Sequence, residues 1–65
     1  MEPTYDGKTE KAREVFADAY DRECFDYGFH AGWHGGGEAG FGQAGEAWES
    51  GKRNGARQRD EDDRR

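Results

Sequence analysis

The sequence predicts an all-α protein, and three observations lead to this prediction. Apolar residues in positions 12–20 recur three and four places apart, which is the spacing of one face of a helix. Over residues 25–44, glycines and aromatics recur at every fourth position, close to one helical turn. A β-strand would instead need apolar and polar residues to alternate, and a four-residue repeat does not give that pattern.

The composition limits the core that such helices can build. The chain has 65 residues, 31% of them hydrophobic and 38% charged, and it contains neither Leu nor Ile. Its nine aromatic residues supply most of the surface that can be buried, about 150–250 Å² each. Its eleven glycines allow backbones to approach one another closely. We therefore expect a single small unit without an ordinary aliphatic core.

The charge is uneven along the chain. Residues 1–50 contain four Lys and Arg against eleven Asp and Glu, whereas residues 51–65 contain six against four. The acidic body argues against non-specific duplex binding, because neutralising phosphates supplies most of that affinity. Cys24 is the only cysteine, which excludes an internal disulfide and suits a reducing, cytoplasmic compartment. No membrane span is expected, since the longest stretch free of Asp, Glu, Lys and Arg has eleven residues.

The expected elements follow in chain order. Residues 1–8, with the only proline, are predicted to be a disordered lead. A helix then begins at Thr9, a suitable N-cap, with Glu10 in the first turn where the helix dipole favours negative charge. The helical module extends over residues 9–54. Residues 55–65 have no apolar residue beyond an alanine and are predicted to be a disordered charged tail.

The four-residue repeat arranges like residues in rows. One row is small and consists of Gly28, Gly32, Gly36, Gly40 and Ala44. The row beside it is aromatic and consists of Phe25, Phe29, Trp33 and Phe41. Each row drifts about 40° per step, so a straight partner could follow it for only about four turns. Two folds remain open: one long helix, straight or kinked, over about residues 9–54, or a helical hairpin that turns at Gly35, Gly36 and Gly37.

The glycines of this repeat indicate a docking surface. Ten glycines lie between residues 28 and 55, and each costs about 1 kcal/mol relative to alanine inside a helix. Contacts that only glycine permits could offset that cost, whereas the alternative, a flexible linker, has no reason to keep its glycines in register. We therefore predict a glycine groove beside an aromatic ridge that receives another helix, formed by Phe25, Gly28, Phe29, Gly32, Trp33, Gly36, Gly40, Phe41 and Trp48.

The stretch GFHAGW at residues 28–33 resembles two known repeat types, and the resemblance covers about residues 24–45. One is the deca-Gly-x-x-x family of eukaryotic adaptors that help to deliver iron–sulfur clusters. The other is the GxxxG stretch of the flagellar export ATPase regulator, a helix whose glycine row is associated with dimerisation. The chain departs from both in its triple glycine and in having only four glycines in register. The resemblance implies helical self-association or hetero-association, and short acidic chains of this style also resemble accessory products of phage genomes.

One group of residues could bind a metal ion. His30 and His34 lie four residues apart, so both imidazoles can reach one divalent metal from the same helix face. Asp26 and Glu38 extend this row and could complete or orient the site. The alternative is a solvated polar face that carries two histidines.

Catalysis has little support in the sequence. Cys24 and His30 could serve as nucleophile and base, but a chain of this length without a concave core has no place to enclose a substrate. Cys24 is instead expected to continue the apolar stripe of Phe16 and Tyr20. The glycine run lacks the Gly-Lys-Ser/Thr ending of a phosphate-binding loop.

Three functions remain. The first is a small non-catalytic protein–protein interaction module, a homo-oligomer or a binder of a partner helix, with a phage or bacterial accessory or inhibitory role. It needs no cofactor. The second is a metal-binding helical module that uses His30 and His34. The third is a single-stranded nucleic-acid accessory factor in which Phe29 and Trp33 stack on bases and residues 52–59 supply positive charge.

Overall fold

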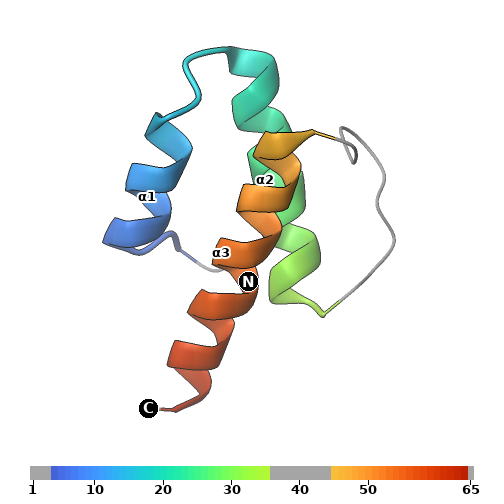
Figure 1. Cartoon of the computed structure of the whole chain (residues 1–65). Helices are drawn as coiled ribbons and strands as arrows, with labels where there is room; N and C mark the ends of the chain where they lie inside the picture. Colours follow the sequence, from blue (N-terminus) through green and yellow to red (C-terminus); the bar gives the residue numbers. More distant parts are fainter. Residues whose placement is uncertain (1–3, 36–44, 65) are drawn as a thin grey trace.

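The computed structural model describes residues 4–35 and 45–64. Three helices form within these residues: α1 (Gly7–Glu14), α2 (Ala19–Trp33) and α3 (Glu46–Asp63) (Figure 1). All regular structure in the described ranges is helical, which confirms the all-α prediction. Some residues singled out in the sequence lie outside these ranges, namely Gly36, Gly37, Glu38, Gly40, Phe41 and Ala44.

Helices α2 and α3 pack side by side and run in the same direction. Their contacts advance together along both helices, from Gly28 beside Trp48 to Gly32 beside Lys52. Helix α1 runs the opposite way (Figure 1). Two helices that follow one another along the chain are therefore parallel.

The prediction of one long helix over about residues 9–54 is wrong. Helix α2 ends at Trp33, His34 is its C-cap, and Gly35 has a φ of 69°. Glycine adopts this left-handed backbone without strain because it has no Cβ. The alternative that breaks the helix in the glycine run 35–37 agrees with this end, although the helices on either side of the break are parallel and not antiparallel as in a hairpin.

The N-terminal part forms two helices where a single stripe was predicted. Asp6 caps α1 in place of Thr9, because its Oδ1 accepts a hydrogen bond from the Thr9 backbone N–H at 2.7 Å. A second aspartate, Asp18, caps α2 by accepting a hydrogen bond from the Tyr20 N–H at 3.1 Å. An aspartate that binds backbone donors in this way starts a new helix and interrupts the old one. As a result Val15, predicted on the buried stripe, is 77% exposed.

The segments predicted as a disordered lead and a disordered tail also differ from the structure. Helix α1 begins inside the lead, and α3 continues through the predicted tail to Asp63. Gly55 and Gln58 are buried against the rest of the protein, so this part of α3 belongs to the packed unit. Ion pairs between residues four apart further support its exposed turns, and they join Arg57 to Glu61, Arg59 to Asp63 and Asp60 to Arg64.

The core is small and largely aromatic. Its buried residues come from α2 and α3 and are Cys24, Phe25, Phe29, Ala47 and Trp48. The segment before α1 covers this core, since the ring of Tyr5 meets that of Phe29 edge to face with centroids 4.6 Å apart. Among the helices of the described ranges, none is both long and apolar enough to span a bilayer.

Candidate functional site

The predicted glycine groove lies at the contact between α2 and α3. A Cβ atom placed on Gly28 would be 2.0 Å from the carbonyl oxygen of Trp48. A Cβ atom placed on Gly32 would be 2.1 Å from the carbonyl oxygen of Lys52. Real Cβ atoms essentially never come within 3.0 Å of a heavy atom outside their own stretch of chain. The two backbones therefore touch at points where only the hydrogen of glycine fits.

Two further glycines, on α3, make this contact reciprocal. A Cβ atom on Gly51 would be 2.0 Å from the carbonyl oxygen of Phe25, and one on Gly55 would be 2.3 Å from that of Phe29. This second pair was not among the predicted residues of the groove. Gly51 and Gly55 have the same Gly-x-x-x-Gly spacing as the first pair. The prediction of a disordered tail from residue 55 placed these two glycines in different segments.

The predicted aromatic ridge is buried beside these glycines. Phe25 and Phe29 of α2 are 0% and 2% exposed, and Trp48 of α3 is 5% exposed. Trp33 is partly buried and stacks on Phe29, with ring centroids 6.2 Å apart. The described residues of the predicted groove and ridge therefore meet within one chain, and α3 occupies the surface that was expected to receive a partner helix.

The residues expected to contact nucleic acid are engaged within the chain. Phe29 is in the core, and Lys52 lies over the ring of Trp48 with its Nζ 5.3 Å from the centroid. Arg59 donates a hydrogen bond from Nη1 to the Trp33 carbonyl oxygen at 2.7 Å. Binding of single strands needs aromatic rings that bases can reach, and of the two rings predicted to stack on bases Phe29 is buried and Trp33 is partly buried.

A polar network attaches α1 to α3. The guanidinium of Arg57 donates to both carboxylate oxygens of Asp6, at 3.1 Å from Nη1 and 3.0 Å from Nη2. The fully buried Thr9 donates its hydroxyl to Oε1 of Gln58 at 3.0 Å. The hydrogen bond from Arg57 holds the pKa of Asp6 well below its usual range. No periodic signal in the sequence marks these four residues, because they are polar and lie far apart in the chain.

A second network attaches α1 to α2. Arg13 donates to both oxygens of Asp26, at 2.8 Å from Nε and 3.0 Å from Nη2. The hydroxyl of Tyr5 donates to the same carboxylate. Hydrogen bonding to Asp26 raises the pKa of Arg13. Asp26 was expected to complete or orient a metal site, and in the structure it joins two helices instead.

The two predicted metal ligands lie close together. The ring centroids of His30 and His34 are 4.5 Å apart on the exposed side of α2. Cys24 is buried, whereas both histidines are exposed. Over residues 4–35 and 45–64, no three side chains of His, Cys, Asp or Glu gather into a metal site. The histidines therefore form a pair that offers two ligands.

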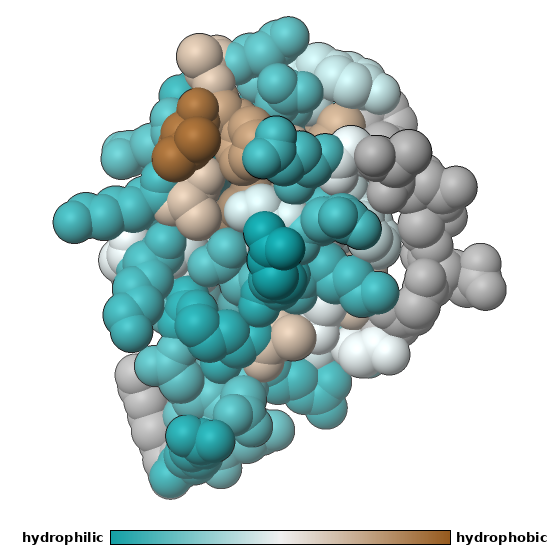
Figure 2. All heavy atoms as spheres, in the orientation of Figure 1, coloured by the Kyte–Doolittle hydropathy of each residue, from teal (hydrophilic) through white to brown (hydrophobic). Residues whose placement is uncertain are grey.

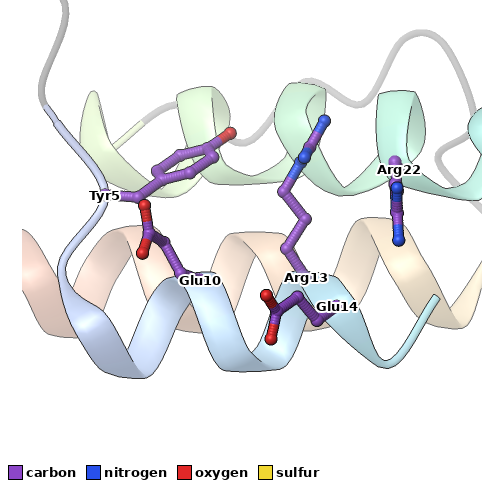
Figure 3. Close-up of a pocket in the computed structure, with 5 residues that line it drawn as sticks. All are labelled: Tyr5, Glu10, Arg13, Glu14 and Arg22. Carbon is purple, nitrogen blue, oxygen red and sulfur yellow. The ribbon is translucent and has the colours of Figure 1, made fainter.

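A cavity of about 300 Å³ opens between α1 and the start of α2, lined by Tyr5, Glu10, Arg13, Glu14 and Arg22 (Figure 3). In Figure 3 Arg13 points from α1 toward α2, and Arg22 points back from α2 toward α1. Arg22 donates from Nε to the carbonyl oxygen of Phe16 at 2.7 Å. The Arg13 guanidinium thus joins α1 to α2, and the Arg22 guanidinium joins α2 to the turn that follows α1. The cavity is a charged gap between the two helices.

The outer face of α2 differs in composition from the exposed faces of the other helices. From its second residue to its C-cap, the exposed side chains of α2 are Tyr20, Glu23, Tyr27, His30 and His34. We call these five residues the outer stripe. The exposed side chains of α1 and α3 are mostly charged, whereas the stripe contains one carboxylate. Electrostatic interaction with the neighbouring Cys24 side chain raises the pKa of Tyr20.

Apolar surface also gathers at the turn from α1 to α2. Figure 2 shows it at the upper left, over the end of α1, while the surface over the end of α3 is hydrophilic. Among the described residues, the large hydrophobic side chains that are exposed are Val15 (77%), Tyr20 (55%) and Tyr27 (55%). All three belong to α2 or to the turn before it, and none belongs to α3.

Comparison of the chain with protein-family models, curated proteins and solved structures finds no match.

Proposed function

We propose that this chain is a small non-catalytic module that binds protein through the outer stripe of α2. The observation that carries the proposal is the composition of the stripe, which has two tyrosines, two histidines and one glutamate on a surface otherwise dominated by charged side chains. Protein interfaces are enriched in tyrosine and depleted in Lys, Glu and Asp relative to the remaining surface. Tyr20 and Tyr27, each 55% exposed, present large side chains of the favoured kind.

The proposal places the docking surface on the opposite side of α2 from the glycines. Gly28 and Gly32 contact the backbone of α3, so a partner helix could reach them only after α3 had left. The glycine contact acts as a support, because it fixes α2 against a second helix along its inner side. A rigid support lowers the entropic cost of binding at the outer stripe.

A photo-crosslinking amino acid at position 27 tests this proposal. The matched control carries the same amino acid at Arg53, an exposed position of α3. On irradiation at low micromolar concentration, alone and with extract of the native cell, we expect protein adducts from position 27 and few from position 53. Equal labelling at both positions, or none at 27 in either sample, would contradict the proposal.

A second candidate function is metal binding by His30 and His34. It is favoured by the 4.5 Å separation of their rings on an exposed helix face, which suits two-point binding of a divalent metal. On titration with zinc or nickel, the protein should then bind the metal, as measured by calorimetry, and α2 should become more stable, as measured by thermal melting. A variant with both His30→Ala and His34→Ala should show neither effect, and an equal response in that variant would remove the candidate.

A further inference from the structure

We propose that the outer stripe of α2 binds a second copy of this chain, with the two α2 helices antiparallel about a two-fold axis beside Tyr27. The inference rests on the proposed function and names its partner. It concerns the face of α2 that stays exposed among the described residues after α3 has covered the glycines and α1 has packed against α2 and α3.

The spacing of the stripe is that of a helix–helix seam. Its residues follow one another at steps of three, four, three and four, from Tyr20 to His34. This is the alternation that keeps side chains facing a second helix in a coiled coil. Side chains between these steps are buried or partly buried on the inner side of α2. The stripe is therefore a continuous ridge along the whole helix.

The polar groups of the stripe are complementary to themselves in one orientation. In an antiparallel pair centred on Tyr27, the residue seven places before it faces the residue seven places after it, so Tyr20 meets His34 of the second copy. Glu23 then lies beside His30 of the second copy, and a carboxylate can accept a hydrogen bond from an imidazole N–H. A parallel pair would instead bring the two Glu23 carboxylates together.

The symmetry of this arrangement matches the commonest protein dimer. A two-fold interface uses the same patch on both copies, so each contact between Glu23 and His30 occurs twice. Association does not have to supply hydrogen bonds to buried side chains, since the buried polar side chains of the described residues all have partners within one copy. One helix face is smaller than a standard interface, so the association is weak and reversible.

Sedimentation of the purified full chain over a range of concentrations, with a chelator present, tests the inference. We expect reversible dimers, and Tyr27→Glu should lower the association constant more than about tenfold, since it places charges together at the centre of the seam. Glu23→Lys and His30→Glu should each weaken the dimer. The double variant should recover it, because the introduced lysine would then face the introduced glutamate of the second copy. Glu49→Lys, an equal charge change at an exposed position of α3, is the control and should leave the dimer unchanged.

The outcomes separate this inference from the proposed function. A chain that stays monomeric at the highest concentration overturns the dimer, and so does a dimer that Tyr27→Glu leaves intact. Failure of the double variant to recover association overturns the antiparallel arrangement. A monomer that still forms adducts with another protein from position 27 overturns the second copy as partner and leaves the docking surface in place. Circular dichroism melts of each variant confirm that the fold is retained.

Discussion

The interface between α2 and α3 and the attachment of α1 show two opposite ways of joining helices. Between α2 and α3, glycines let two backbones touch, and aromatic rings close the sides of the contact. Ion pairs and hydrogen bonds join α1 and the residue that caps it to the other helices, led by Arg57 with Asp6 and Arg13 with Asp26. The first interface depends on shape and the second on charge.

This difference explains how so short a chain with few aliphatic residues can fold. The glycine contact brings two helices close enough for a few aromatic side chains to form a core. The cost in helix propensity, about 1 kcal/mol for each glycine, is offset by packing along both helices. Helix α1 then needs to bury little apolar area, because polar contacts partly shielded by the core fix its position. The two interfaces should therefore respond differently to substitution.

The largest effect is expected when a side chain is added to the glycine contact. Gly28→Leu places a branched side chain where even a Cβ would be 2.0 Å from a backbone oxygen, so α2 and α3 must separate. We expect loss of cooperative unfolding in circular dichroism melts. Gly28→Ala gains about 1 kcal/mol of helix propensity but should still lose about 2 kcal/mol net through overpacking.

Gly7→Ala is the matched control for this prediction. Gly7 is also in a helix, but a Cβ there meets nothing within 4 Å. The substitution should not destabilise the fold and should gain at most about 1 kcal/mol of helix propensity at this first position of α1. Equal destabilisation by the two alanine variants would show that the close contact of α2 and α3 does not hold the fold together.

A smaller effect is expected when the polar attachment of α1 is cut. Arg57→Ala removes the guanidinium that donates to Asp6 and to the Thr9 hydroxyl. Because its side chain is 30% exposed, solvent screens the interaction, and we expect a loss of about 1–2 kcal/mol. Amide exchange should speed up in α1 more than in α2. Uniform acceleration in all helices would mean that α1 and the glycine contact unfold as one unit.

Gly35→Ala tests a glycine that is needed for its backbone conformation and not for a contact. Its φ of 69° is strained for alanine, while the nearest atom to an added Cβ is the flexible Arg59 side chain at 3.7 Å. We expect a loss of about 1 kcal/mol in chemical denaturation. Gly35→Asn should lose less, because asparagine tolerates this conformation better. The same loss in both variants would exclude backbone strain as its cause.

The smallest effect is expected from the charge of Asp6. Because Arg57 lowers the pKa of Asp6 in the folded protein, this carboxylate stabilises the fold above its unfolded pKa of about 4 and stabilises it less as the pH falls below that value. Asp6→Asn should cost about 1 kcal/mol at neutral pH after allowance for solvent screening. The difference from the wild type should shrink between about pH 5 and pH 2. A difference that does not vary with pH would rule out this ion pair as its source.

The sequence allowed prediction of some parts of the site and not of others. The four-residue repeat identified Gly28, Gly32, Phe25 and Phe29 as residues of a close helix contact, because that contact needs small residues on one helix face. It did not identify what they contact. Docking on another molecule and docking on α3 place the same demands on α2, so the pattern within one helix cannot distinguish them.

The outer stripe was predicted only in part, as the pair of His30 and His34. Tyr20 was assigned to a buried face, because the apolar stripe was extended from residues 12–16 across a position where the helix ends. Asp18 caps α2 and so starts it as a separate helix, in which Tyr20 is exposed. A local hydrogen bond therefore changed which face of the next helix is open to solvent.

The sequence by itself determined that the chain is helical and that its glycines and aromatics share one face of α2, and it marked the triple glycine as one candidate place for a helix to end. These features follow from spacing and from the backbone preferences of individual residues. Tertiary structure alone decided that the glycine face is filled by α3, in parallel, and that α1 is held by polar pairs. The physical reason is that such choices depend on contacts between distant residues, such as Gly28 with Trp48 and Asp6 with Arg57, whose energies no local pattern records.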